Sequence, residues 1–332
     1  MMRTAVVGLG WWGRYMVNAL QGDSHLEVVA GMDVNLDAAQ DLAKEFDLPL
    51  FDDYQSVLDD KNVDAVILTT PHGLHEEQVL AAAAADKQIF CEKPLALTAD
   101  AAKRMVEACQ AKGLVLGIGH ERRYEGALEE MKRMHDEGEL GTLLNIEFNA
   151  SYNLFAGTPA SGWRQDPKQA PAGTMTALGV HQTDYIQTLA GPVREITARM
   201  SHRSDLFPAE DVLSVQFVFE SGALGTFTSI ATTPFYQRMT VLGDKAWAEV
   251  VEVANVDKPD PSLLRWRGLD TEIHTRTYQR TDTVVANLHA WADAVAGKGT
   301  YRFTPEQLLH NVEILDGIVR SMESGKTVTI GG

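Results

Sequence analysis

The chain has few cysteines, no excess of positive charge and no long apolar run, and each absence excludes a class of protein. Only Cys91 and Cys109 are present among 332 residues, and they form no C-x-x-C motif, so we expect buried, reduced thiols. A net charge of −17 excludes nucleic acid and anionic membranes as partners, because both attract basic surfaces. No apolar run reaches the roughly 18–20 residues of a membrane helix.

The composition indicates a globular protein of two domains. Hydrophobic residues make up 45% and charged residues 23% of the chain, as in ordinary soluble proteins. A single core rarely grows beyond about 250–300 residues, so a chain of 332 residues has room for two. The N-terminus enters a strand pattern at once, with no signal-peptide segment, and we therefore expect a cytoplasmic location.

A glycine-rich turn follows the first apolar run. Gly8, Gly10 and Gly13 form G-x-G-x-x-G between that run and a helical pattern, as in the dinucleotide-binding βαβ unit. There the first glycine permits the tight turn, the second lets the backbone approach a pyrophosphate, and the third lets the helix pack on the strand. Trp11 and Trp12, inside the motif, shield the phosphate turn or reach toward substrate.

Asp33 ends the second apolar run, residues 26–32, twenty positions after Gly13. A carboxylate at this place accepts hydrogen bonds from the adenosine ribose and repels a 2′-phosphate. No Arg or Lys follows in residues 34–36 to receive such a phosphate, so the sequence predicts NAD rather than NADP. The alternative is that Asp33 only ends a strand or caps a helix.

Strand and helix patterns alternate up to about residue 120, which predicts a doubly wound parallel sheet of the Rossmann type in residues 1–120. Beyond this point the pattern changes to half-buried strands, and Ser221-Gly222 joins two of them as a hairpin. We expect residues 121–332 to form an α+β domain with a mostly antiparallel sheet. The expected helices cover residues 35–46, 75–85, 98–112, 125–137 and 304–324, with Asn35 and Thr98 as the N-caps of the first and third. The later strands cover 143–149, 212–220, 223–230, 239–242 and 246–253.

Several segments, in order along the chain, resemble the glucose-fructose oxidoreductase/inositol dehydrogenase/MocA family. The resemblance spans essentially the whole chain, behind the glycine fingerprint. It is carried by Glu92-Lys93-Pro94, Thr70-Pro71-His72-Gly73-Leu74-His75, Gly119-His120-Glu121-Arg122-Arg123-Tyr124, Gly162-Trp163-Arg164 and Gly173-Thr174-Met175-Thr176-Ala177-Leu178-Gly179-Val180-His181-Gln182-Thr183-Asp184.

The resemblance implies a nicotinamide oxidoreductase that moves a hydride at a carbinol carbon of a sugar, cyclitol or related diol. Lys93 and His181 match the catalytic lysine and histidine, and the peptide before Pro94 is implied to be cis. It also implies a homodimer or homotetramer built through the antiparallel sheet. The expected substrate side comprises Asp184, Trp163, Arg164, Arg122, Arg123 and Tyr124, and the expected cofactor side adds Thr70, Pro71, His72, His75 and Glu92 to the glycines, the two tryptophans, Asp33 and Lys93.

One position departs from the family pattern. The family often carries an aspartate four residues before the histidine, and here that residue is Ala177. Proton transfer then depends on Lys93 and His181 alone, or Asp184 supplies the carboxylate, or the site no longer catalyses the usual reaction. The reference pKa of histidine, about 6.5, suits general acid–base work near neutral pH, whereas that of lysine is about 10.4.

Two local patterns have competing interpretations. His72 and His75 do not form the zinc motif H-E-x-x-H, because counting from His75 places Val79 where the second histidine should be. The sequence therefore predicts no metal site. Arg122 and Arg123 contact a substrate carboxylate or phosphate, or else form ion pairs with a neighbouring acidic helix.

Two other functions remain open. The first is an enzyme that uses NAD transiently for elimination or hydrolysis of a sugar derivative, which would accumulate no NADH. The second is a NAD-binding sensor that lost chemistry with the aspartate at the position of Ala177, which would bind NAD without turnover.

Overall fold

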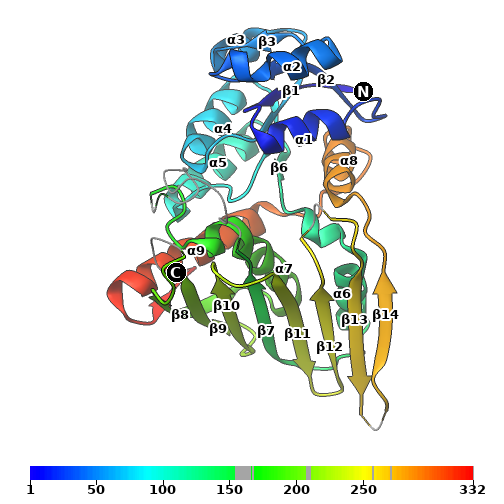
Figure 1. Cartoon of the computed structure of the whole chain (residues 1–332), viewed down its shortest axis with the longest axis vertical. Coiled ribbons are helices and arrows are strands. Elements are labelled where there is room, and N and C mark those ends of the chain that lie inside the picture. Colours follow the sequence, from blue (N-terminus) through cyan, green and yellow to red (C-terminus); the bar gives the residue numbers. More distant parts are fainter. Residues whose placement is uncertain (154–165, 167, 207–210, 256–257, 270, 332) are drawn as a thin grey trace. The chain divides into compact units, whose positions relative to one another are not determined.

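The computed structural model describes residues 1–153, 166, 168–206, 211–255, 258–269 and 271–331. The chain forms two compact units, Met1–Glu121 with Val284–Leu309, and Arg122–Thr283 with His310–Gly332 (Figure 1). The chain first passes from one unit to the other between Glu121 and Arg122, next to the expected division at residue 120. The sequence did not indicate that residues 284–309 belong to the N-terminal unit. Among the described residues, no helix has the length and apolar character that crossing a membrane requires.

The N-terminal unit is built on a six-stranded sheet in the order β3-β2-β1-β4-β5-β6, and every pairing is parallel. This confirms the predicted doubly wound Rossmann sheet. Its strands are β1 (Met2–Val7), β2 (Leu26–Met32), β3 (Leu50–Phe51), β4 (Ala65–Leu68), β5 (Gln88–Cys91) and β6 (Leu116–Ile118).

Helices follow the strands of this unit, and the side chains of Asn35, Asp53 and Thr98 each cap the helix that begins after them. The side chain of Asn35 accepts a hydrogen bond from the Ala38 N–H, and that of Thr98 from the Ala101 N–H, as the sequence predicts. The helices are α1 (Trp11–Ala19), α2 (Leu36–Phe46), α3 (Tyr54–Asp59), α4 (His75–Ala84), α5 (Ala99–Ala111) and, from later in the chain, α8 (Thr283–Val295).

Both cysteines are free and buried, as expected. Burial raises the pKa of the Cys109 thiol to about 11. Neither thiol is therefore poised to react as a thiolate near neutral pH.

Residues 284–309 cover the outer edge of β6, the side on which no further strand of this sheet pairs with it. Asn287 Nδ2 donates to the Ile118 carbonyl at 2.7 Å, and the Ile118 N–H donates to the Tyr301 hydroxyl at 3.2 Å. Trp291 is fully buried against Phe90 and donates to the Val115 carbonyl. Unpaired backbone groups at a sheet edge are a liability, and these side chains satisfy them. Residues 284–309 therefore complete this unit by supplying hydrogen-bond partners for its edge.

The second unit is built on a nine-stranded sheet in the order β14-β13-β12-β11-β7-β10-β9-β8-β15. All its described pairings are antiparallel except that of β7 with β10, which confirms the predicted α+β class. The predicted hairpin is β9 with β10. The strands are β7 (Leu143–Ser151), β8 (Val193–Ser201), β9 (Val212–Phe219), β10 (Leu224–Ile230), β11 (Tyr236–Gly243), β12 (Ala246–Glu252), β13 (Ser262–Gly268), β14 (His274–Tyr278) and β15 (Val328–Thr329).

Helices α6 (Gly126–Asp136), α7 (Val180–Ala190) and α9 (Pro305–Ser324) complete this unit. Helix α6 packs against β12 and β13, and α7 against β7. Stacked aromatic rings lie in the core, where Phe148 contacts Phe217 and Phe227 at centroid distances of 5.7 and 4.8 Å. The packing leaves α7 almost wholly buried, which matters because it carries His181.

The role of α8 in the N-terminal unit is testable with a matched pair of tryptophans. Trp291→Ala should lower the free energy of unfolding by about 3–5 kcal/mol, because it leaves a cavity and removes a hydrogen bond from the β6 edge. Trp11→Ala should change it by less than about 0.5 kcal/mol, since Trp11 is 64% exposed. Urea unfolding followed by circular dichroism measures both. Equal, small effects would contradict the packing of α8 on β6.

Candidate active site

The turn between β1 and α1 depends on two glycines. Gly8 has φ of +92°, a conformation that residues with a side chain rarely adopt. A Cβ at Gly13 would collide with the Gly8 carbonyl oxygen, so no larger residue allows α1 to lie this close to the turn. The Thr69 hydroxyl donates to the same carbonyl at 2.5 Å. These two glycines therefore have the conformational roles that the motif predicts.

Asp33, at the end of β2, lies directly beside the glycine turn. Its Oδ2 accepts the Leu9 N–H at 2.7 Å, and its Oδ1 accepts the Asn35 N–H at 2.8 Å. The carboxylate is half-buried and held in place. Arg14 of α1 lies near the first turn of α2, since its guanidinium donates to the Ala38 carbonyl.

The features of this turn fit a dinucleotide. A Cβ at Gly10 would meet no atom within 4 Å, so the space over the turn is open. Helix α1 begins at the next residue, and the first N–H groups of a helix attract phosphate. Trp11 extends into solvent, whereas the Trp12 ring stacks on Tyr15 at 4.8 Å. Gly10 and the start of α1 would hold the pyrophosphate, and Asp33 the adenosine ribose.

His75, in the first turn of α4, links two loops at the end of the sheet. It is fully buried, with Nδ1 2.9 Å from the Pro94 carbonyl oxygen and Nε2 3.0 Å from that of Thr70. Burial lowers the pKa of His75, and a neutral imidazole donates its single N–H to one of these two carbonyls. His75 thus supports the loop that carries Lys93, while Pro71 and His72 are half-buried beside it.

The Glu92-Lys93-Pro94 segment directly follows β5. The Lys93–Pro94 peptide is cis, as the resemblance implies. Glu92 is buried, its Oε2 accepts the Lys93 N–H at 3.1 Å, and a Cβ at Gly119 would collide with its carboxylate. The backbone of Lys93 is therefore held by Glu92 and, through Pro94, by His75.

The predicted cofactor residues gather at one edge of the N-terminal sheet. Gly8, Asp33, Thr70 and Lys93 follow the ends of β1, β2, β4 and β5. Because these strands are parallel, their carboxyl ends lie at the same edge, where doubly wound sheets bind ligands.

His181 lies at the second position of α7 and is 4% exposed. A π-helical turn, Met175–Gly179, precedes it and contains Ala177; such turns often occur at functional sites. Asn311 of α9 fixes the first turn of α7, since its Nδ2 donates to the Val180 carbonyl and its Oδ1 accepts from Thr183. The backbone that carries His181 is thus anchored on both sides.

Asp184 and Arg123 form a buried, bidentate ion pair. Arg123 Nε lies 2.7 Å from Asp184 Oδ2, and Arg123 Nη2 lies 2.7 Å from Asp184 Oδ1. The side chains are only 5% and 1% exposed. Asp184 is one helical turn after His181, so the pair ties that part of α7 to the segment before α6.

Arg122 belongs to a second buried group of charges. Its Nη1 lies 3.2 Å from Glu125 Oε1, and Arg280 contacts both Glu125 and Glu252 at 3.4 and 3.0 Å. Burial, and then the charge of Glu125, raise the pKa of Glu252 to about 8. A cavity of about 10 Å³ beside the group has room for one water molecule. Arg122 and Arg123 thus form ion pairs, which is the alternative that the sequence left open.

The remaining expected substrate residues are placed only in part. Tyr124 is 8% exposed, next to the two arginines. Trp163 and Arg164 lie outside the described residues.

The site residues expected from the sequence do not include Asn311, Glu252 or Arg280. Asn311 has one recognisable signal, because it is a polar residue in register with the apolar stripe of α9 at Leu308 and Leu315, and buried polar groups usually have partners. Glu252 and Arg280 have none, since their partners are distant in sequence.

Two family models match the chain. "Oxidoreductase family, NAD-binding Rossmann fold" matches residues 2–120, and "GFO/IDH/MocA C-terminal domain" matches residues 128–249. A D-xylose 1-dehydrogenase (NADP(+)) of Haloferax volcanii is 26% identical over 328 residues, 98% of each chain. A 2,7-anhydro-N-acetylneuraminate hydratase of Escherichia coli is 26% identical over 238 residues, 68% of this chain and 61% of the relative.

The fold has close structural relatives. A crystal structure from Desulfitobacterium hafniense matches with a TM-score of 0.90 at 25% identity, over 99% of this chain and 97% of that one. The family models match the Rossmann sheet and the antiparallel sheet in the same order as the structure shows them. The chain therefore belongs to the Gfo/Idh/MocA family of oxidoreductases, whose N-terminal domain is an NAD-binding Rossmann fold.

Proposed function

We propose that this protein moves a hydride between NAD and a carbinol carbon of a sugar, cyclitol or related diol. The observation that carries the proposal is the place of Lys93, at the sheet edge that also bears the glycine turn and Asp33. Its backbone is held by Glu92 and, through Pro94, by His75. The named activity of the xylose dehydrogenase relative supports a sugar as substrate.

Lys93 and His181 would move the hydroxyl proton of the substrate. Bound NAD would supply the hydride acceptor. An imidazole with a pKa near its reference value of about 6.5 both accepts and donates a proton near neutral pH. An ammonium group donates a hydrogen bond to the substrate oxygen and stabilises negative charge that develops on it. With Ala177 at the place of the family aspartate, these two groups carry the chemistry.

Asp184 has a positioning role in this proposal. Its carboxylate oxygens are held by Arg123, so the pair orients α7 and the backbone of His181. A carboxylate in such a pair is poorly suited to exchange protons, because a protonated Asp184 would leave a buried guanidinium charge uncompensated.

We also propose a cytoplasmic homodimer or homotetramer assembled through the antiparallel sheet. Leu224 and Tyr236 are 52% and 49% exposed. They lie opposite Asn145 and Ser151 of β7, an even number of residues apart, so both lie on the same face of the sheet and support an interface there.

A second candidate is redox-assisted elimination or hydration, in which NAD is used transiently. The hydratase relative and the missing aspartate at Ala177 favour it. Absorbance of reduced nicotinamide over a screen of polyols, aldoses and diols separates the two functions. The dehydrogenase accumulates NADH, whereas the transient mechanism converts substrate without net NADH.

The cofactor preference should follow from Asp33. We expect NAD to bind at least about tenfold more tightly than NADP, or about 1.4 kcal/mol, because the carboxylate repels a 2′-phosphate. Asp33→Ala should narrow this ratio, and it should also weaken NAD itself because Leu9 loses its partner. Calorimetric titration with both oxidised cofactors measures the ratio.

Two variants control the cofactor experiment. Asp37→Ala, on the exposed first turn of α2, should leave the ratio unchanged. Arg14→Gln tests the nearby cation, and it should also leave the ratio unchanged if Asp33 decides. Equal or tighter NADP binding by the wild type would contradict the NAD assignment.

Lys93 should act in the chemistry and not as an anchor for the dinucleotide. Lys93→Met keeps most of the side-chain length but removes the charge, so turnover should fall by about 10²–10⁴-fold while NAD affinity changes little. His181→Ala should lower turnover to a similar extent. The loss of turnover in the double variant should be far smaller than the product of the two single losses. Lys103→Met, on the exposed face of α5, is the matched control. Near-normal single-turnover rates in Lys93→Met would favour the NAD-binding sensor instead.

Breaking the Arg123–Asp184 ion pair should change the free energy of unfolding measurably. Asp184→Asn should lower the free energy of unfolding by about 3–5 kcal/mol, because it leaves the buried Arg123 charge without a counter-charge. The double variant Arg123→Met with Asp184→Leu should lose less free energy of unfolding than the two single variants lose in sum. Asp136→Asn, which weakens only surface contacts with Lys132 and His135, is the control. A stable Asp184→Asn protein without turnover would instead make Asp184 a proton carrier.

A further inference from the structure

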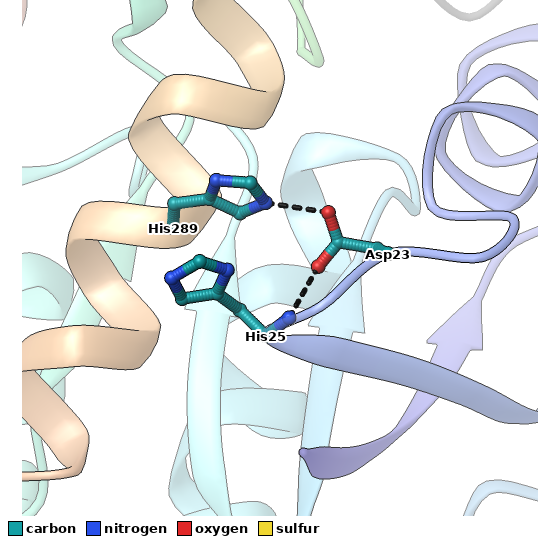
Figure 2. A group of neighbouring side chains, drawn as sticks. All are labelled: Asp23, His25 and His289. Atoms are coloured by element: carbon teal, nitrogen blue, oxygen red, sulfur yellow. Dashed lines mark hydrogen bonds and ion pairs between the residues drawn. The ribbon is translucent and has the colours of Figure 1, made fainter.

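Two histidines and an aspartate meet in the N-terminal unit, in a place that the proposed reaction does not use. Asp23 and His25 lie in the turn between α1 and β2, and His289 lies on α8 (Figure 2). His289 Nε2 is 2.5 Å from Asp23 Oδ2, and the two imidazole rings stack at 4.0 Å with an interplanar angle of 22°. Two stacked imidazolium ions would repel each other, so the stack favours at least one neutral ring, which has a lone pair for a metal.

The donor atoms of these residues match a common ligand set for zinc. Each residue offers one atom, and the three atoms lie within 4.8 Å of one another. Two imidazole nitrogens and one carboxylate oxygen, with a water molecule, complete a tetrahedral zinc site. Asp293, one turn after His289 on α8, adds another oxygen, 3.7 Å from His25 Nε2.

The neighbours of these side chains hold them as outer-shell groups hold metal ligands. Asp23 Oδ1 accepts the N–H groups of His25 and Leu26 at 2.8 and 2.9 Å, which fixes the carboxylate. His25 Nδ1 lies 3.0 Å from the Ser24 hydroxyl, and its Nε2 faces Asp293. Whichever nitrogen of His25 binds a metal, the other keeps a polar partner, as is usual for histidine ligands.

We propose that Asp23, His25 and His289 bind a zinc ion that links α8 to the turn before β2. The ion would replace the proton between His289 and Asp23. If the His289 ring is an imidazolium, this proton is released to solvent, and if the ring is neutral, the proton moves to Nδ1. Zinc bonds of about 2.0–2.2 Å in tetrahedral geometry separate ligand atoms by roughly 3.3 Å. The His289–Asp23 contact must therefore open by less than about 1 Å, and the widest pair must close by about 1.5 Å.

The side chains have the freedom for this adjustment. His25 and His289 are each 30% exposed, and Asp293 is 39% exposed, so small rotations meet little packing resistance. The site could not be expected from the sequence, because its residues come from segments more than 260 positions apart. A zinc ion here would strengthen the same attachment of α8 that covers the edge of β6.

The test uses the full chain without an affinity tag, after removal of metals by a chelator. Calorimetric titration with zinc chloride should show one equivalent bound, and zinc should raise the melting temperature. His289→Gln and His25→Gln should each weaken binding by at least about 100-fold, beyond the loss that outer-shell changes cause. His310→Gln is the matched control, since His310 pairs with Glu313 in the other unit, and it should bind zinc normally. Magnesium, which prefers oxygen ligands, should not compete.

A second measurement keeps the proposal falsifiable if a variant fails to fold. Proton NMR of the wild type follows the ring signals of its ten histidines during zinc addition. The signals of His25 and His289 should change first and at one equivalent. The absence of binding, unchanged affinity in folded His289→Gln, or changes at other histidines first would each overturn the proposal.

Discussion

The parallel direction of β1, β2, β4 and β5 is the constraint on which the candidate cofactor site depends. Each strand ends at the same edge of the sheet, so Gly8, Asp33, Thr70 and Lys93 come together although they span 86 positions of the chain. The contact between Gly8 and Gly13 then sets how closely α1 approaches this edge. The positions of the phosphate turn and of the lysine are therefore both consequences of strand direction.

Burial of polar groups is organised differently in the two units. In the N-terminal unit, the Tyr301 hydroxyl, the Asn287 amide and the Trp291 indole satisfy the backbone of one edge strand. In the second unit, the buried polar groups include charges, paired as Arg123 with Asp184 and grouped around Glu252. Such pairs add little net stability compared with apolar packing, but they are costly to break and so hold α7 in one arrangement.

The departure at Ala177 is compatible with the proposed catalysis, in which Lys93 and His181 would carry the proton. Ala177 sits in a π-helical turn directly before α7, and Asn311 anchors the turn that follows. The backbone around His181 is thus held without the family aspartate. Asp184 is the nearest carboxylate along the helix, yet its oxygens are taken by Arg123.

The sequence by itself determined the fold class, the glycine turn, the place of Asp33 and Lys93, and the helix caps at Asn35 and Thr98. These features depend on local backbone conformation and on hydrophobic periodicity, which neighbouring residues encode. Only the tertiary structure decided that residues 284–309 complete the N-terminal unit, that Arg122 and Arg123 form buried ion pairs, and that Asp23 meets His289. Each of these depends on pairing between distant segments, and charged or polar side chains follow no periodicity that identifies a partner. Burial decides the roles of such residues, and burial is a property of the assembled fold.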